Sequence, residues 1–178
     1  MDNFCYQCEQ TVAGGCVKTG NCGKDPTTSV LQDLVVHASK GIAMYAHRAQ
    51  QLGAHDDVIG RHIVEALFAT VTNVDFDPAR LEELLGELGH TLERARKLYL
   101  AACERAARAP EALTGPAAWV PASTRDGLIE QAGLASLKTS IRIKGADVTG
   151  LQELVLYGLK GTAAYAHHAL ALGKESSA

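Results

Sequence analysis

Two stretches of the chain share one pattern: LQDLVVHASKGIAMYAHRAQQLG at residues 31–53 and LQELVLYGLKGTAAYAHHALALG at residues 151–173. They are identical at 13 of 23 aligned positions, and apolar residues recur in them at steps of three and four. That spacing places apolar side chains on one face of an α-helix. The offset of 120 residues is too long for a solenoid repeat, which runs about 20–50 residues. We therefore expect one kind of core helix to be used twice within a single helical bundle.

Each copy carries a glycine in the middle of the expected helix, Gly41 in the first and Gly161 in the second. Glycine inside a helix costs about 1 kcal/mol relative to alanine. Its presence at both equivalent positions predicts that another backbone approaches the helix closely there. The histidines His47, His167 and His168 are expected on a polar helix face rather than at a metal or haem site.

Capping signals divide the rest of the chain. Asp25-Pro26 and Asp77-Pro78 each place an N-cap residue before a proline suited to the first helical position. Residues 109–122 hold three prolines and no clean period, so they form a linker that we expect Trp119 to pin onto the bundle. Helices are predicted at about 26–52, 55–73, 78–108, 123–132 and 149–173. The predicted fold class is all-α: an up-and-down helical bundle at 26–178, with an N-terminal cysteine-rich cluster-binding loop at 1–25 across one end.

Four of the five cysteines lie in the first 22 residues, at Cys5, Cys8, Cys16 and Cys22, with the spacing C-x2-C-x7-C-x5-C. The odd fifth cysteine, Cys103, argues against a disulfide framework and is expected to be a small buried core residue. Four thiolates in one short loop can instead converge on a soft metal centre. Iron–sulfur clusters and zinc are the main candidates.

The spacing favours an iron–sulfur cluster over zinc but leaves zinc open. Structural zinc sites usually draw on two C-x2–4-C pairs, and only Cys5 and Cys8 form such a pair. A cubane cluster offers four separated iron corners, which staggered gaps can wrap. Lys18 and Lys24 beside the last cysteine could offset the charge of a cluster or dock an electron donor, and we expect them to be simply solvated.

Composition narrows the possible partners. The chain has 178 residues and a formal net charge of −3, so charge gives no argument for binding nucleic acid or an anionic membrane. No apolar stretch approaches the ~20 residues that span a bilayer. The N-terminus lacks the basic and apolar regions of a secretion signal. We therefore expect a cytoplasmic protein whose thiols stay reduced.

Several motifs resemble those of one known family. FCYQCEQT at residues 4–11, CGKDP at 22–26 and the two helical stretches resemble, in the same order, the hybrid-cluster proteins, also called prismane proteins or hydroxylamine reductases. The resemblance covers essentially the whole chain. In that family, four N-terminal cysteines with this short spacing bind a 4Fe-4S cluster, whereas a longer-spaced form carries a two-iron cluster. The resemblance thus implies a 4Fe-4S cluster ligated by Cys5, Cys8, Cys16 and Cys22.

The resemblance also implies what this sequence lacks. Complete members carry two further α/β domains that supply ligands to a hybrid Fe-S-O cluster, the expected place of hydroxylamine or nitric oxide reduction. No cysteine follows Cys103, so we expect a domain that is not catalytically complete alone. Its implied role is one-electron transfer between a reductase and a catalytic domain or subunit.

Two other functions stay open on the sequence alone. One is an iron–sulfur sensor or interaction module that responds to oxygen or nitric oxide. The other is a structural zinc-binding helical domain. Helical faces that further domains would cover are expected to be apolar, which favours a homodimer or a complex with a redox partner.

Overall fold

The computed structural model describes residues 3–10 and 14–174. Within them the regular secondary structure is helical, apart from one isolated β-bridge, which confirms the predicted all-α class. The parts of the predicted loop and bundle at 1–2, 11–13 and 175–178 lie outside the described residues. The helices are, in chain order, α1 Pro26–Gln51, α2 Asp57–Ala69, α3 Pro78–Arg105, the 3₁₀ turn η1 Gly115–Ala118, α4 Arg125–Ala135, α5 Leu137–Lys144 and α6 Ala146–Ala171.

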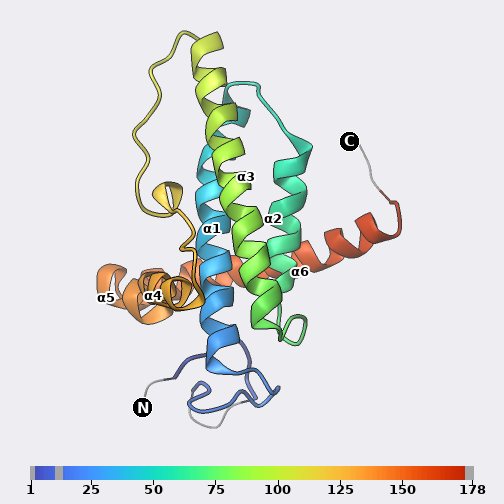
Figure 1. Cartoon of the computed structure of the whole chain (residues 1–178), viewed down its shortest axis with the longest axis vertical. Coiled ribbons are helices and arrows are strands. Elements are labelled where there is room, and N and C mark those ends of the chain that lie inside the picture. The colour runs from blue at the N-terminus through green and yellow to red at the C-terminus, as the bar shows by residue number, and fades with distance from the viewer. Residues whose placement is uncertain (1–2, 11–13, 175–178) are drawn as a thin grey trace.

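Helices α1, α2 and α3 run side by side in alternating directions (Figure 1). The two long helices α1 and α3 make the most extensive contact and enclose the core. Each fully buried leucine contributes about 1.5–3 kcal/mol to stability. The apolar face predicted for α1 is confirmed, because its members are buried: Leu31, Leu34, Val35, Ala38, Ile42, Tyr45 and Ala49.

An aspartate caps each of these three helices. The side chains of Asp25, Asp56 and Asp77 accept hydrogen bonds from backbone N–H groups in the first turns of α1, α2 and α3. This satisfies donors that a helix start leaves without partners. Helix α2 is shorter than the predicted 55–73. Helix α3 ends before the predicted 108, where Ala107 adopts a left-handed φ of 50°.

The linker after α3 runs back along the bundle to α4 (Figure 1). Trp119 is buried, and its Nε1–H donates to Oε1 of Gln131 in α4 at 3.1 Å, so this tryptophan pins the linker as predicted. The unpredicted η1 turn packs on α1. A Cβ built on Gly41 would lie 2.2 Å from the carbonyl oxygen of Pro116 in η1. The close backbone approach predicted at Gly41 is therefore confirmed. The same prediction was wrong for Gly161, because no atom of the described residues lies within 4 Å of a Cβ built there.

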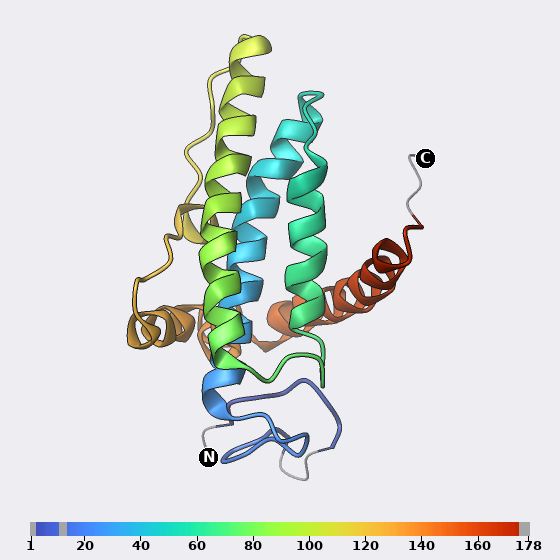
Figure 2. The same ribbon diagram turned by 45° about the vertical axis from the view of Figure 1, so that its right-hand side comes forward.

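Helices α4, α5 and α6 lie across the lower end of α1–α3 rather than alongside them (Figure 2). One face of α6 packs on α2. Helix α6 begins before the predicted residue 149, and α4 lies slightly later than the predicted 123–132. The sequence did not predict α5, whose eight residues include no buried side chain. No helix in the described part of the chain is long and apolar enough to cross a membrane.

Candidate metal centre

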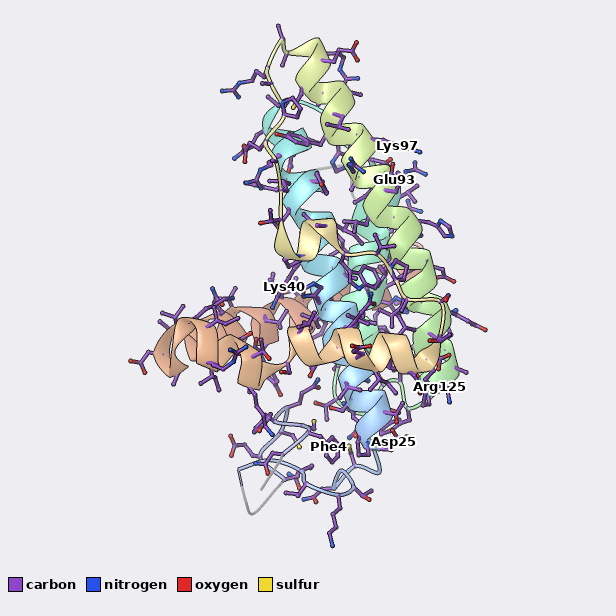
Figure 3. The ribbon with its side chains drawn as sticks, turned by 60° about the vertical axis from the view of Figure 1, so that its left-hand side comes forward. Phe4, Asp25, Lys40, Glu93, Lys97 and Arg125 are labelled. Atoms are coloured by element: carbon purple, nitrogen blue, oxygen red, sulfur yellow. The ribbon has the colours of Figure 1, made fainter. Side chains whose placement is uncertain are left out.

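The cysteine loop, residues 3–10 and 14–25, lies at the end of the bundle where α1 begins (Figures 1 and 3). Its two ends are held there by the first turns of that helix. Ser29 Oγ donates to the carbonyl oxygen of Phe4 at 3.1 Å. Asp25 Oδ1 accepts from the backbone N–H of Thr28 at 2.7 Å. The N-cap of α1 thus also ends the loop, which places the loop directly at the helix N-terminus.

Backbone hydrogen bonds bring distant cysteines of the loop together. The Phe4 N–H donates to the carbonyl oxygen of Cys16 at 2.8 Å, and the Cys16 N–H donates to that of Cys5 at 2.9 Å. Cys5 and Cys16 thereby become antiparallel neighbours. Around the last cysteine, the Gly20 N–H donates to the carbonyl oxygen of Lys24 at 2.7 Å, which closes a turn.

All four cysteines of the loop carry free thiols. Cys16 is buried, and Cys5, Cys8 and Cys22 are half-buried. Thiols in such positions are shielded from water but remain able to bind a ligand. No three His, Cys, Asp or Glu side chains in the described stretches are grouped closely enough to hold a single metal ion. The fit of a centre with several metal atoms is therefore judged on donor chemistry and on the space beside the thiols.

Gly20 keeps that space open beside Cys22. A Cβ at Gly20 would lie 3.3 Å from Cys22 Sγ and 3.1 Å from the carbonyl oxygen of Lys24. Bare backbone beside a thiolate allows close approach of inorganic sulfide. The donor chemistry of the loop, four free cysteine thiols, therefore fits a thiolate-ligated centre.

Lys24 anchors the loop to the bundle, so the prediction that it is solvated was wrong. It is 1% exposed, and its Nζ donates to Oε1 of Gln32 on α1 at 2.5 Å. Gln32 Nε2 in turn donates to the carbonyl oxygen of Asp75, between α2 and α3, at 2.9 Å. The partner of Lys24 is fixed by this tertiary contact, which the local sequence does not reveal. Lys18 is exposed, as predicted.

A second buried lysine reaches the loop from α6. Lys160 is 9% exposed, and its Nζ donates to the carbonyl oxygen of Thr70, the C-cap residue of α2, at 3.3 Å. When the amide nitrogen of Gln7 faces the same carbonyl, at 3.1 Å, the Gln7 oxygen accepts from Lys160 Nζ at 3.3 Å. Gln7 lies between Cys5 and Cys8. The sequence did not predict that Lys160 is buried beside the loop. The one feature that could have drawn attention to it is the Lys-Gly pair that both copies of the repeat contain.

The three histidines noted in the sequence lie away from the loop on helix surfaces. His47 and His168 are exposed, as expected for a polar face. His167 is half-buried and stacks on Phe68 of α2 with ring centroids 4.3 Å apart. The ring of His168 meets that of Phe68 edge-on, at 5.5 Å. His167 and His168 thus help to pack α6 on α2.

The fold and the loop together define the class of protein. It is an all-α domain with four free cysteines in a loop at the start of its first long helix. The sequence model of the Prismane/CO dehydrogenase family matches residues 3–178. The chain therefore belongs to the Prismane/CO dehydrogenase family, whose proteins bind iron–sulfur clusters. The resemblance drawn from the sequence motifs is confirmed.

Curated relatives agree with this assignment. The chain is 51% identical over 172 residues to the hydroxylamine reductase of Rhodospirillum rubrum, a match that covers 96% of the chain and 31% of the relative. The chain is 49% identical over 181 residues to the hydroxylamine reductase of Burkholderia ambifaria, a match that covers 97% of the chain and 32% of the relative. The chain is 46% identical over 178 residues to the hydroxylamine reductase of Geobacter sulfurreducens, a match that covers 98% of the chain and 32% of the relative. The chain thus spans about a third of the length of these relatives and matches their N-terminal portion.

Proposed function

We propose that this chain is a 4Fe-4S electron-transfer domain that corresponds to the N-terminal third of hydroxylamine reductases. Cys5, Cys8, Cys16 and Cys22 would hold the cluster, which takes up and releases single electrons when bound. The chain's own residues hold the thiolates, shield them from water and set the charge around them. The reductase activity named for the longer relatives is assigned here to a catalytic centre outside this chain.

The observation that carries the proposal is the position of the four free thiols in one hydrogen-bonded loop against the start of α1. The N-terminus of a helix carries a partial positive charge. Helix α1 begins at Pro26, just after Cys22, so its dipole favours an anionic thiolate centre there. Membership in a family of iron–sulfur proteins supports the same interpretation.

Anaerobic purification with iron and acid-labile sulfide quantitation tests the proposal. About four irons and four sulfides per chain, with a cubane-type EPR signal after dithionite reduction, are expected of a 4Fe-4S centre. Cys5→Ser and Cys22→Ser should each abolish that signal. The matched control is Cys103→Ser, which changes a buried cysteine of α3 outside the loop and should leave the iron content unchanged. About one zinc per chain with no sulfide would refute the electron-transfer role.

We also propose that electron relay requires a partner on the outer face of α6. The two copies of the internal repeat differ in burial. Leu34 and Tyr45 of α1 are 0% and 7% exposed, whereas Leu154 and Tyr165, their equivalents in α6, are 70% and 81% exposed. Apolar side chains gathered on one helix face favour burial against another surface. Further exposed apolar residues of α6 are Val148, Leu151, Val155, Tyr157 and Leu159, and the C-cap residue Leu172 is exposed as well.

The occupant we propose for this face is the polypeptide that corresponds to the remaining two thirds of the relatives, whether joined to this chain or separate. The relatives match over only about a third of their length, so two thirds are available to cover the face. Co-expression with the remaining part of the Rhodospirillum rubrum protein should give a one-to-one complex in light scattering. Leu154→Asp should break this complex. A homodimer that excludes the second polypeptide, or a monomer in its presence, would contradict the assignment.

A further inference from the structure

Charged side chains are buried between the cysteine loop, α1, α2 and α6. Lys24 and Lys160 are 1% and 9% exposed, and Asp33 of α1 is half-buried within electrostatic range of both. Removing a charge from water is unfavourable unless partners compensate for the lost hydration. None of these three side chains is a proposed cluster ligand. Their position beside the loop therefore indicates a separate role.

The ammonium group of Lys160 joins three segments of the chain. Its first acceptor, the Thr70 carbonyl, belongs to the C-terminal end of α2, where the helix dipole favours a cation. In the amide orientation that satisfies both groups of Gln7, its second acceptor is the side-chain oxygen of Gln7, between the first two cysteines of the loop. Figure 1 shows α6 passing behind the lower part of the bundle, toward the end that carries the loop. Lys160 is thus placed to hold the Cys5–Cys8 segment against α2.

Asp33 supplies the opposing charge. The charged groups that act on Asp33 are Lys160 and Glu153 of α6, Lys24 and Lys40. Those that act on Lys160 are Asp33, Lys24, Glu153 and Cys5. Burial raises the pKa of Asp33 to about 7 and lowers the pKa of Lys160 to about 8, while each partly offsets the effect of burial on the other. Lys160 therefore remains mostly charged next to the loop at neutral pH.

We propose that Lys160 is a positioning residue that anchors the cysteine loop through Gln7, and that its positive charge raises the reduction potential of the centre in that loop. The second half of this statement rests on the proposed 4Fe-4S function. On reduction the centre gains one electron from an external one-electron donor, and its charge becomes one unit more negative with no proton transferred. A nearby cation stabilises the reduced state, and a nearby anion destabilises it.

Alkylation of the loop thiols tests the anchor. The protein is purified anaerobically, its iron content is measured, and the rate at which iodoacetamide modifies Cys5 and Cys8 is followed by mass spectrometry. Lys160→Met should raise this rate about tenfold, because a hydrogen bond to a charged group is lost. Lys160→Arg, which keeps the charge and donors, should restore a rate near that of the wild type.

The matched control is Lys97→Met, which removes the same charge from the outer surface of α3 near the other end of the bundle (Figure 3). It should alkylate at the wild-type rate. If Lys160→Met also alkylates at that rate while circular dichroism shows it folded, the anchor is refuted. Wild type and variants are compared at equal iron content, because a thiolate that binds iron is protected from alkylation.

A potentiometric titration with dithionite, monitored by EPR, tests the electrostatic role. At neutral pH, Lys160→Met should lower the midpoint potential, whereas Lys160→Arg and Lys97→Met should leave it near the wild-type value. A shift in Lys160→Arg as large as that in Lys160→Met, or no shift in Lys160→Met, would overturn the electrostatic role. A wild-type preparation without iron would refute the proposed function, and the alkylation rates would still decide whether Lys160 anchors the loop.

Discussion

Replacing each repeated glycine by alanine tests how differently the two copies of the repeat are packed. In Gly41→Ala the new methyl carbon would lie 2.2 Å from the carbonyl oxygen and 2.7 Å from the carbonyl carbon of Pro116, closer than real Cβ contacts. Overpacking costs about 1–3 kcal/mol, and the contact is with backbone, which cannot swing aside. The helical gain of alanine over glycine is about 1 kcal/mol. Contact with fixed backbone puts the overpacking cost near the top of its range, at about 2–3 kcal/mol, so we expect a net loss of about 1–2 kcal/mol.

Gly161→Ala should have the opposite effect. No atom lies within 4 Å of a Cβ at Gly161, so only the helical gain of about 1 kcal/mol remains. Because 1 kcal/mol shifts Tm by about 2–4 °C in a chain of this size, the two variants should separate clearly in thermal unfolding followed by far-ultraviolet circular dichroism. The reasoning fails if Gly41→Ala is as stable as the wild type, or if both variants shift Tm in the same direction.

Two further predictions concern pH. Folded Asp33 has a pKa of about 7 against its ordinary 3.8, so between these values the unfolded chain binds fewer protons and stability falls as pH rises. Asp33→Asn should remove this fall in the free energy of unfolding, which is at most about 4 kcal/mol. Urea unfolding at several pH values measures it, and an equal pH dependence in the variant and the wild type would contradict the prediction. The hydrogen bond from Arg94 lowers the pKa of Asp56, so its contribution is present at neutral pH and is lost as pH falls through that pKa. Asp56→Ala, which also removes the N-cap of α2, should cost about 1 kcal/mol at neutral pH, and a cost that does not shrink on acidification would contradict the ion-pair contribution.

Capping residues close in the sequence predicted where the long helices begin. Asp25 and Asp77 mark the starts of α1 and α3, because an N-cap is a contact between residues two or three apart. Helix α5 was missed although Ser136 caps its start and Gly145 follows its end. A helix of eight residues without a buried face has no periodicity that would distinguish it from a turn.

The repeat shows where sequence prediction stops. The two stretches are identical at 13 of 23 positions, and both do form long helices. Identical residues nevertheless differ in environment: Lys40 is exposed and Lys160 is buried, while Leu34 is buried and Leu154 is exposed. Burial depends on what packs against a helix, and this information lies in the rest of the chain. The cysteine motif can be recognised in the sequence because its four cysteines lie within 18 residues of one another. The contacts of Lys24 and Lys160 join distant segments, and the local sequence does not reveal them.

Helix α6 links the two proposals, because its inner side carries Lys160 and its outer side carries the apolar residues around Leu154. A partner that covers the outer side would exclude water from the helix and lower the dielectric around Lys160. Charge–charge interactions strengthen as the surrounding dielectric falls. We therefore expect Lys160→Met to lower the midpoint potential of the proposed centre more in the complex than in the isolated chain. This complex is the one formed with the polypeptide that corresponds to the remaining two thirds of the relatives. Equal shifts of the midpoint potential in the complex and in the isolated chain would contradict this expectation. They would mean that docking on α6 does not change the effect of the Lys160 charge.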